Sequence, residues 1–401
     1  MESRRLSIKY KLGEISVINP RETIKKGTIA KKVDMAVLQP FTRKIPSFEW
    51  LEYRGGTKFR NGDTIMARIT PCLENGKTSQ VSILDDNEVG FGSTEYIVFR
   101  AKEGISDHNF LYYLICSDIV RNPAIKSMVG SSGRQRVQTD VIQNLEIDLP
   151  PLKTQKQIAS ILSALDDKIE LNNKINENLE SQAQAIFKSW FVDFEPFGGV
   201  MPENWRTGSL SEICGYSKDK VNIEDLTLDT YYSTENMQPN RQGAVQATTL
   251  PTIKQTTACK KGNVLISNIR PYFKKIIYCF ADCGCSTDVL CFVPNKSEYS
   301  AFVYCALYSD KFFDYMVAGS KGTKMPRGDK QQIMMYPICI PSTEYVEQFS
   351  KIVAPMFETV YTNRLEANDL AILRDTLLPK LMNGEIDVSK VKISAEINCK
   401  F

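Results

Sequence analysis

Residues 157–172 have the sequence QIASILSALDDKIELN, and this stretch decides the fold. From here towards residue 186, apolar residues recur at steps of seven, beside a second apolar row: Ile158, Leu165, Leu179 and Ile186, then Leu162, Ile169 and Ala183. This spacing is typical of the pairing face of a coiled-coil helix. Thr154 and Gln157 have the form of a capping box, so we expect the helix to begin there.

The same pattern returns near the end of the chain and predicts a second long helix. Its apolar rows are Phe349, Met356, Leu370 and Leu377, then Val353, Val360 and Ala367. Asn172 and Asn363 occupy equivalent heptad positions, where a buried Asn lowers stability but selects the register of pairing. One stripe alone would be explained by an ordinary core helix, whereas two matched stripes favour helix pairing. Pro355 should kink the second helix or mark the start of its regular portion. The predicted pairing residues are Ile158, Leu165, Asn172, Leu179, Phe349, Met356, Asn363 and Leu370.

The two helices are parts of an imperfect duplication of the whole chain. The matched segments keep the same order in both halves: Leu12-Gly13-Glu14-Ile15 with Leu210-Ser211-Glu212-Ile213, Asn61-Gly62-Asp63 with Lys261-Gly262-Asn263, Ile69-Thr70-Pro71 with Ile269-Arg270-Pro271, Ser93-Thr94-Glu95 with Ser286-Thr287-Asp288, Gly130-Ser131-Ser132-Gly133 with Gly319-Ser320-Lys321-Gly322, and Leu149-Pro150 with Ile340-Pro341. A chance origin would not preserve that order.

The remainder of each half predicts strands joined by glycine-containing turns. Residues 95–99 and 289–293 are the clearest strands, and residues 108–119 and 300–316 are expected to be helical. We therefore predict an α+β fold. Its parts are a first domain at 1–150, a central helix at 151–195, a second domain at 196–341, a distal helix at 342–384 and a C-terminal tail at 385–401.

Composition excludes several classes of protein. No apolar run could span a bilayer and the N-terminal segment is charged, so we expect a soluble cytoplasmic protein without membrane contact. The chain has 11 cysteines, and this odd number without an export signal predicts free thiols. The group Cys279, Cys283, Cys285 and Cys291 lacks the CxxC spacing of zinc sites, so no metal site is predicted. The net charge of +3 is nearly balanced, so binding to nucleic acid would require local basic patches or partners.

Two stretches of the chain carry a specific resemblance. The first comprises residues 149–152, 157–159, 162–172, 175–177 and 185–194, and the second comprises residues 373–386. They resemble the central and distal conserved regions of the specificity subunits of type I restriction-modification enzymes. Gly62-Asp63, residues 67–72 and residues 92–95 are similar to the first target-recognition domain of many members, so the resemblance covers essentially the whole chain.

The resemblance implies a pseudo-twofold protein without catalytic residues. Two target-recognition domains, residues 1–150 and 196–341, would be separated by two antiparallel helices, and each would recognise half of a bipartite site in double-stranded DNA. Two methyltransferase subunits would dock on the helices, with two restriction subunits as an optional further pair. S-adenosylmethionine, ATP and Mg²⁺ would be bound by these partners and no cofactor by this chain. A helix of roughly 35 residues spans about 50 Å, so half-sites about one DNA turn apart are geometrically reasonable.

Other functional classes have weaker support in the sequence. Asn75-Gly76-Lys77-Thr78 ends like a phosphate-binding loop, but Pro71 replaces the first glycine that the motif requires. Gly90-Phe91-Gly92 lies within a predicted strand and does not open a helix. His108 is the single histidine, which limits nucleophile and base arrangements. The remaining alternatives are a coiled-coil scaffold without DNA contact, and a recognition subunit of a methyltransferase-only or related restriction system.

Candidate DNA-contacting residues follow glycine-containing loops in both repeats. These cations are Arg134 and Arg136 in the first half, and Lys324 and Arg327 in the second. A second set flanks the two Ile-x-Pro turns and comprises Arg68, Lys77, Arg270 and Lys274. Each could lie on a solvated face instead, and phosphate contact is the default because it is commoner than base contact.

Phe191 and Phe194 are the candidate partner-binding residues. They belong to an aromatic stretch, Trp190 to Phe194, at the end of the central helix. Packing against the adjacent domain explains them equally well.

Overall fold

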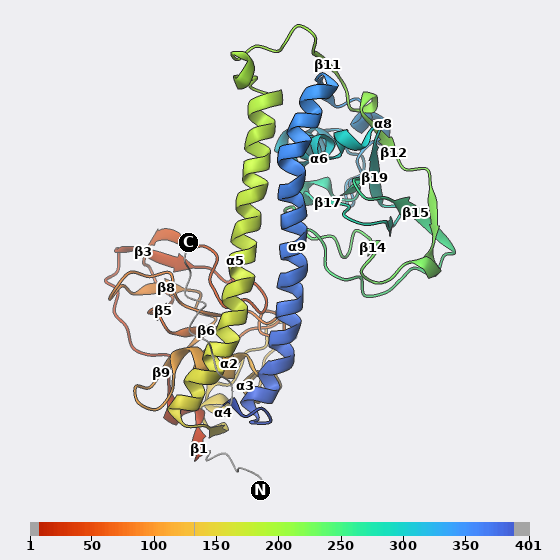
Figure 1. Ribbon diagram of the computed structural model, residues 1–401. Helices are drawn as coiled ribbons and strands as arrows, with labels where there is room; N and C mark the ends of the chain where they lie inside the picture. The colour runs from red at the N-terminus through yellow and green to blue at the C-terminus, as the bar shows by residue number, and fades with distance from the viewer. Residues whose placement is uncertain (1–7, 132, 389–401) are drawn as a thin grey trace. The chain divides into compact units, whose positions relative to one another are not determined.

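The computed structural model describes residues 8–131 and 133–388 and divides into two compact units (Figure 1). Unit 1 comprises Met1–Leu171 with Glu366–Phe401, and unit 2 comprises Asn172–Leu365. Each unit contains one half of each long helix, α5 (Leu152–Phe191) and α9 (Thr343–Met382). The predicted C-terminal tail lies, apart from its first four residues, outside the described residues.

Unit 1 contains two four-stranded sheets with the strand orders β2-β9-β6-β7 and β4-β3-β8-β5. The strands are β2 (Ser16–Ile18), β3 (Ile29–Val33), β4 (Glu49–Glu52), β5 (Thr57–Phe59), β6 (Thr64–Ala67), β7 (Thr78–Gln80), β8 (Gly90–Gly92) and β9 (Tyr96–Ala101). The short helices are α1 (Leu12–Ile15), α2 (His108–Cys116), α3 (Asp118–Lys126) and α4 (Thr139–Gln143). β1 (Ile8–Lys11) pairs antiparallel with β10 (Glu146–Leu149), which joins the beginning of the domain to its end.

Unit 2 repeats this plan with the strand orders β12-β19-β16-β17 and β13-β15-β18-β14. Its strands are β11 (Arg206–Ser209), β12 (Cys214–Tyr216), β13 (Lys220–Asn222), β14 (Tyr231–Tyr232), β15 (Gln255–Cys259), β16 (Val264–Ser267), β17 (Ile276–Tyr278), β18 (Cys283–Cys285), β19 (Val289–Pro294) and β20 (Pro337–Ile340). Its helices include α6 (Ser300–Tyr308), α7 (Asp310–Ala318) and α8 (Lys330–Met334). β11 pairs with β20 as β1 pairs with β10, so the predicted duplication is visible in the fold.

The edges of the sheets differ between the units. Both units have an antiparallel pair, β5 with β8 and β15 with β18. Both also have a parallel partner on the same strand, β3 on β8 and β14 on β18. The outermost strand differs, because β4 extends from β3 whereas β13 extends from β15. The duplication therefore keeps the sheet interior and changes the periphery.

Each predicted short helix is divided in two by a serine. Ser117 separates α2 from α3, and Ser309 separates α6 from α7; both residues have extended backbones, with ψ of 160° and 149°. The Ser309 side chain accepts a hydrogen bond from the Phe312 N–H, which caps the start of α7. The predicted helices at 108–119 and 300–316 were thus correct in position but missed this break.

The two long helices are antiparallel within each unit, which confirms the predicted architecture. In unit 1, Lys168 forms an ion pair with Glu366 at 3.1 Å, while the earlier residue Ile158 shares a core with the later residue Leu381. In unit 2, Asn363 Nδ2 donates to Asn176 Oδ1 at 2.9 Å, and the Phe187 and Phe349 rings lie 6.0 Å apart.

The predicted capping box at Thr154 and Gln157 was wrong. α5 begins at Leu152, so Thr154 lies inside its first turn and does not cap it. Gln155 instead accepts a hydrogen bond from the Asp107 N–H and donates to the carbonyl oxygens of Ile105 and Pro150. The glutamine therefore joins α5 to the loop before α2. Pro355 lies inside the continuous helix α9, so the alternative that it marks the start of the regular portion was also wrong.

Candidate nucleic-acid interface

In unit 1, backbone contacts join two loops that sequence analysis singled out. We define the turn loop as residues 69–76, which follow β6, and the glycine loop as residues 130–135, which follow α3. Ile69 forms an antiparallel bridge with Arg136, and the Thr70 N–H donates to the Gln135 carbonyl at 3.0 Å. Val129 and Arg136 exchange two backbone hydrogen bonds and close the glycine loop. Arg136 is therefore fixed between both loops.

Unit 2 repeats these backbone contacts position by position. Its turn loop is residues 269–274 and its glycine loop is residues 322–326. Ile269 bridges Arg327, and the Arg270 N–H donates to the Pro326 carbonyl at 2.8 Å. Lys321 and Arg327 exchange two backbone hydrogen bonds at 2.9 Å. Arg136 and Arg327 are thus structural equivalents.

Arg136 forms a two-point ion pair with Glu95, the acidic residue of the first Ser-Thr-Glu motif. Its Nε lies 3.0 and 2.9 Å from the two Glu95 oxygens, and its Nη2 donates to Oε1 at 2.7 Å. The hydrogen bond from Arg136 lowers the pKa of Glu95 below its usual value and outweighs partial burial. The carboxylate therefore holds the guanidinium by one edge.

Arg327 forms the corresponding contact with Asp288 of the second motif. Arg327 Nη2 lies 3.1 Å from the Asp288 carboxylate, and no two-point contact forms. The backbones of the two acids are anchored alike, since the Glu95 carbonyl accepts the Arg68 N–H at 2.9 Å and the Asp288 carbonyl accepts the Asn268 N–H at 2.8 Å.

Arg134 and Lys324 are exposed in the two glycine loops. Among residues 8–131 and 133–388, neither side chain has a hydrogen bond or an ion pair. Both charges are therefore available to a phosphate backbone.

Arg68 and Lys77, by contrast, are bound to backbone carbonyls. Arg68 Nη2 donates to the Val137 carbonyl at 3.1 Å, and Lys77 Nζ donates to the Met35 carbonyl at 2.8 Å. Both side chains are half-buried. Their direct role in this geometry is to hold the loops.

Arg270 and Lys274, the second-unit residues that flank the Ile-x-Pro turn, are not the structural counterparts of Arg68 and Lys77. Asn268 replaces Arg68, because each precedes an equivalent Ile-x-Pro turn and donates its N–H to the motif acid. Lys274 and Arg241 both bind Asp310, at 2.6 and 2.5 Å, and their hydrogen bonds lower the pKa of Asp310 to about 2. Arg270 is half-buried and has a φ of 50°.

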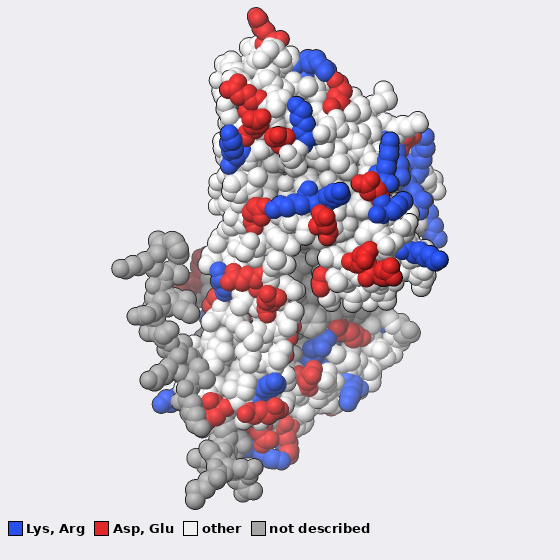
Figure 2. Space-filling view, turned by 45° about the vertical axis from the view of Figure 1, so that its right-hand side comes forward, with Lys and Arg blue, Asp and Glu red and all other residues white. Residues whose placement is uncertain are grey.

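Cationic and acidic side chains are mixed on the face of the molecule that Figure 2 draws. Figure 2 shows one face on which Lys and Arg side chains gather towards the right-hand edge, with Asp and Glu side chains between them. This mixed pattern agrees with the net charge of +3 and with the paired cations of the loops.

Comparisons with known proteins show a similarity to one family. A family model described as type I restriction modification DNA specificity domain matches residues 7–181. The type I restriction enzyme HindI specificity subunit of Haemophilus influenzae is 25% identical, over 82% of this chain and 87% of the relative. The MjaIX specificity subunit of Methanocaldococcus jannaschii is also 25% identical, over 72% of this chain and 71% of the relative. Residues 7–181 therefore resemble the DNA specificity domain of type I restriction-modification enzymes, and both relatives are specificity subunits of type I restriction enzymes.

A solved structure has a similar fold. The S subunit of a type I restriction-modification system from M. genitalium matches with a TM-score of 0.61, over 95% of this chain and 97% of that one, at 16% identity. Within the described ranges, no helix has the length and apolar character needed to cross a membrane. The described cysteines are free thiols.

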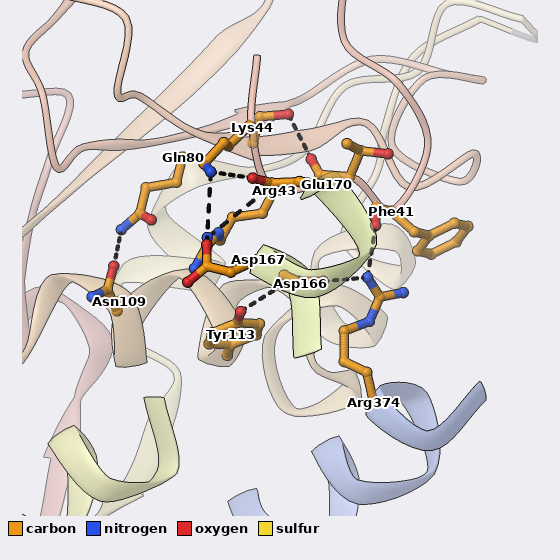
Figure 3. A network of polar contacts seen from close by, with 12 residues as sticks. Phe41, Arg43, Lys44, Gln80, Asn109, Tyr113, Asp166, Asp167, Glu170 and Arg374 are labelled. Carbon is orange, nitrogen blue, oxygen red and sulfur yellow. Dashed lines mark hydrogen bonds and ion pairs between the residues drawn. The ribbon is translucent and has the colours of Figure 1, made fainter. Parts of the chain in front are cut away.

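In unit 1, a polar network fastens the loop before β4 to both long helices (Figure 3). Arg43 pairs with Asp167, and Lys44 pairs with Glu170, all on or facing α5. Arg374 of α9 donates to Asp166 at 2.7 Å. Asp166 also accepts from the Tyr113 hydroxyl of α2 at 2.6 Å, and burial raises the pKa of Tyr113. These contacts fix the domain to its helices.

The predicted helix-pairing residues differ in burial. Ile158, Asn172 and Phe349 are fully buried, whereas the others are partly buried: Leu165, Leu179, Met356, Asn363 and Leu370. Asp166 and Asn176 are buried on α5 although they lie outside the predicted stripe. The buried positions recur at about 3.6 residues, the period of a straight helix, so a strict heptad does not describe them.

Phe191 lies in the core of unit 2, with 3% of its surface exposed. Its ring contacts Trp205, Phe302 and Phe349, with centroids 4.8 to 5.6 Å apart. This burial favours the packing alternative for Phe191. Phe194 is half-buried, and its role in binding a partner stays a prediction.

Glu95 and Asp288 were not predicted as candidate site residues. Both were recognised only as markers of the duplication. The available signal was that an acidic residue and a basic loop residue both recur at corresponding positions in the two halves. Such a recurrence permits an ion pair between distant segments.

Proposed function

We propose that this chain is the DNA-recognition subunit of a type I restriction-modification complex and recognises a bipartite, asymmetric site. The loops of unit 1 contact one half-site, and those of unit 2 contact the other. The observation that carries the proposal is the repeated backbone scaffold, on which Arg136 and Arg327 are equivalent while the neighbouring loop residues differ. Similar scaffolds with different side chains suit two different half-sites.

The chemistry belongs to the partners in this proposal. Two methyltransferase subunits dock on the long helices, bind S-adenosylmethionine and methylate adenine at N6. Two restriction subunits, which use ATP and Mg²⁺, join where the system also cleaves DNA. This chain contributes specificity alone. The similarity of residues 7–181 to a type I DNA specificity domain, and of the chain to a type I specificity subunit, supports this division of labour.

The test is to purify this chain with the methyltransferase of its own system and to incubate the complex with random-sequence double-stranded DNA and S-adenosylmethionine. Sequencing of modified adenines should give two short defined segments separated by a fixed gap, with half-sites about one helical turn apart. The methyltransferase alone is the control. A single contiguous motif, or the same modification without this chain, would contradict the proposal.

A further inference from the structure

Arg136 and Arg327 are candidate DNA-contacting residues, and a cation that binds phosphate would be expected to have no acidic partner. Each of them nevertheless forms an ion pair. An exposed ion pair contributes little to stability, because water screens it and two side chains lose freedom. A paired arginine also has a neutralised charge, so it attracts phosphate less than a free cation does. Neither stability nor phosphate binding therefore explains why both units hold this pair between their loops.

Hydrogen-bond geometry supplies an explanation. A guanidinium has five N–H donors, and Glu95 occupies the edge formed by Nε and one hydrogen of Nη2. No described residue accepts a hydrogen bond from Arg136 Nη1. The opposite edge, made by Nη1 and the second hydrogen of Nη2, keeps two parallel donors. A guanine presents O6 and N7 to such a pair of donors in the major groove.

The pair also fixes the direction of the arginine before DNA binds. The Arg136 backbone is held by bridges to Ile69 and Val129, and the Glu95 N–H donates to the Ser93 hydroxyl at 3.1 Å. A flexible arginine loses rotamer freedom on binding, so prior fixation reduces that loss and favours a single orientation. With 45% of its side chain exposed, Arg136 remains accessible.

We propose that Glu95 and Asp288 are positioning residues that hold Arg136 and Arg327 end-on for two-donor contact with a guanine edge, one in each half-site. This inference rests on the proposed DNA-recognition function. It assigns base contact to these two arginines and leaves phosphate contact to unpaired Arg134 and Lys324. Asp288 makes a single contact at 3.1 Å, so selectivity should be stricter at the position recognised by Arg136.

The test uses the complete complex with its methyltransferase and random-sequence double-stranded DNA. Glu95→Gln removes the negative charge and the two-point grip. It should lower selectivity for guanine at one position of one half-site by about 5- to 150-fold, the range for a two-donor contact. The other half-site and the salt dependence should be unchanged. Asp288→Asn should have the same effect, but smaller, in the other half-site.

Two further variants keep the proposal falsifiable if Glu95→Gln disturbs folding. Arg136→Lys retains the charge but lacks the two-donor edge, so it should relax the same motif position, whereas Glu95→Asp should retain part of the selectivity. Glu146→Gln is the matched control, because it removes an exposed ion pair with Lys9 in the same unit and should leave the motif intact.

An unchanged motif in Arg136→Lys would overturn the inference, as would a uniform loss at every position in Glu95→Gln. A wild-type complex that gives no motif would instead refute the proposed function. A wild-type motif that Arg136→Lys leaves unaltered would refute base contact by Arg136, and one that Glu95→Gln leaves unaltered would refute the positioning role of Glu95, while the proposed function would stand in both cases.

Discussion

At the scale of single residues, the cations in and directly after the glycine loops fall into two kinds. Arg136 and Arg327 have acidic partners, whereas Arg134 and Lys324 are exposed without one among the described residues. A free cation next to DNA gains by neutralising a phosphate and releasing a counterion. The two kinds should therefore affect affinity and specificity differently.

Arg134→Ala and Lys324→Ala should each weaken binding to all sequences and leave the motif unchanged. Each lost phosphate contact should reduce the slope of log K against log salt by about 0.9. The measurement is binding of the complex to specific and random duplexes over a salt series. Lys9→Ala, which removes an exposed cation of β1, is the control. A changed motif with an unchanged slope would show that the loop cation contacts a base instead.

The sequence identified the glycine-loop cations because glycine and arginine stand close together in the chain. It could not separate Arg68 and Lys77 from them, because their carbonyl partners at Val137 and Met35 lie tens of residues away. Glu95 was not predicted as a candidate site residue for a related reason. An acidic residue at a DNA-binding surface is explained by its ion pair with an arginine, and that ion pair is visible only in the structure.

At the scale of elements, both long helices could be predicted from their periodic apolar residues. The exact residues of the helix-pairing face could not be predicted, because a strict heptad and a 3.6-residue helix diverge by about 20° per heptad. The capping box predicted at Thr154 and Gln157 does not start α5, because the helix begins at Leu152 and the intervening Gln155 bonds to Ile105 and Pro150. Such tertiary partners are invisible in a local motif.

Antiparallel pairing predicts a specific cross-link in unit 2. Asn176→Cys with Asn363→Cys should be joined by a short bifunctional thiol reagent, because the two asparagine amide groups are 2.9 Å apart. Asn176→Cys with Glu347→Cys is the control; sixteen residues separate Glu347 from Asn363 on α9, about 24 Å along the helix axis. Mass spectrometry would detect the cross-link. Equal cross-linking of both pairs would contradict the register.

The buried ion pair between Arg374 and Asp166 should be important for unit 1. Their side chains are 12% and 5% exposed, so Arg374→Met leaves a buried carboxylate without its cation. We expect the free energy of unfolding to fall by about 3–5 kcal/mol in urea denaturation followed by circular dichroism.

Two companion variants make that measurement decisive. Adding Asp166→Leu should recover part of the loss, since the uncompensated charge is then removed. Asp375→Asn breaks the exposed contact of the same arginine and should change stability by less than about 1 kcal/mol. A loss of similar size in Asp375→Asn would show that burial of the pair is not the cause.

At the scale of the whole molecule, the duplication was predictable because matched segments keep their order along the chain. The divergent sheet edges, β4 in unit 1 and β13 in unit 2, were not, since strand pairing at an edge depends on segments without a shared motif. The conserved interior and the altered periphery are what two similar modules with different targets require.

Exchange of one module tests whether each unit recognises its own half-site independently of the other. Residues 1–150 would be replaced by the corresponding domain of another family member with a known motif, and the methylated motif of the resulting complex would be sequenced. One half of the motif should change to that of the donor while the other half stays the same. A motif that changes in both halves, or in neither, would contradict recognition by independent modules.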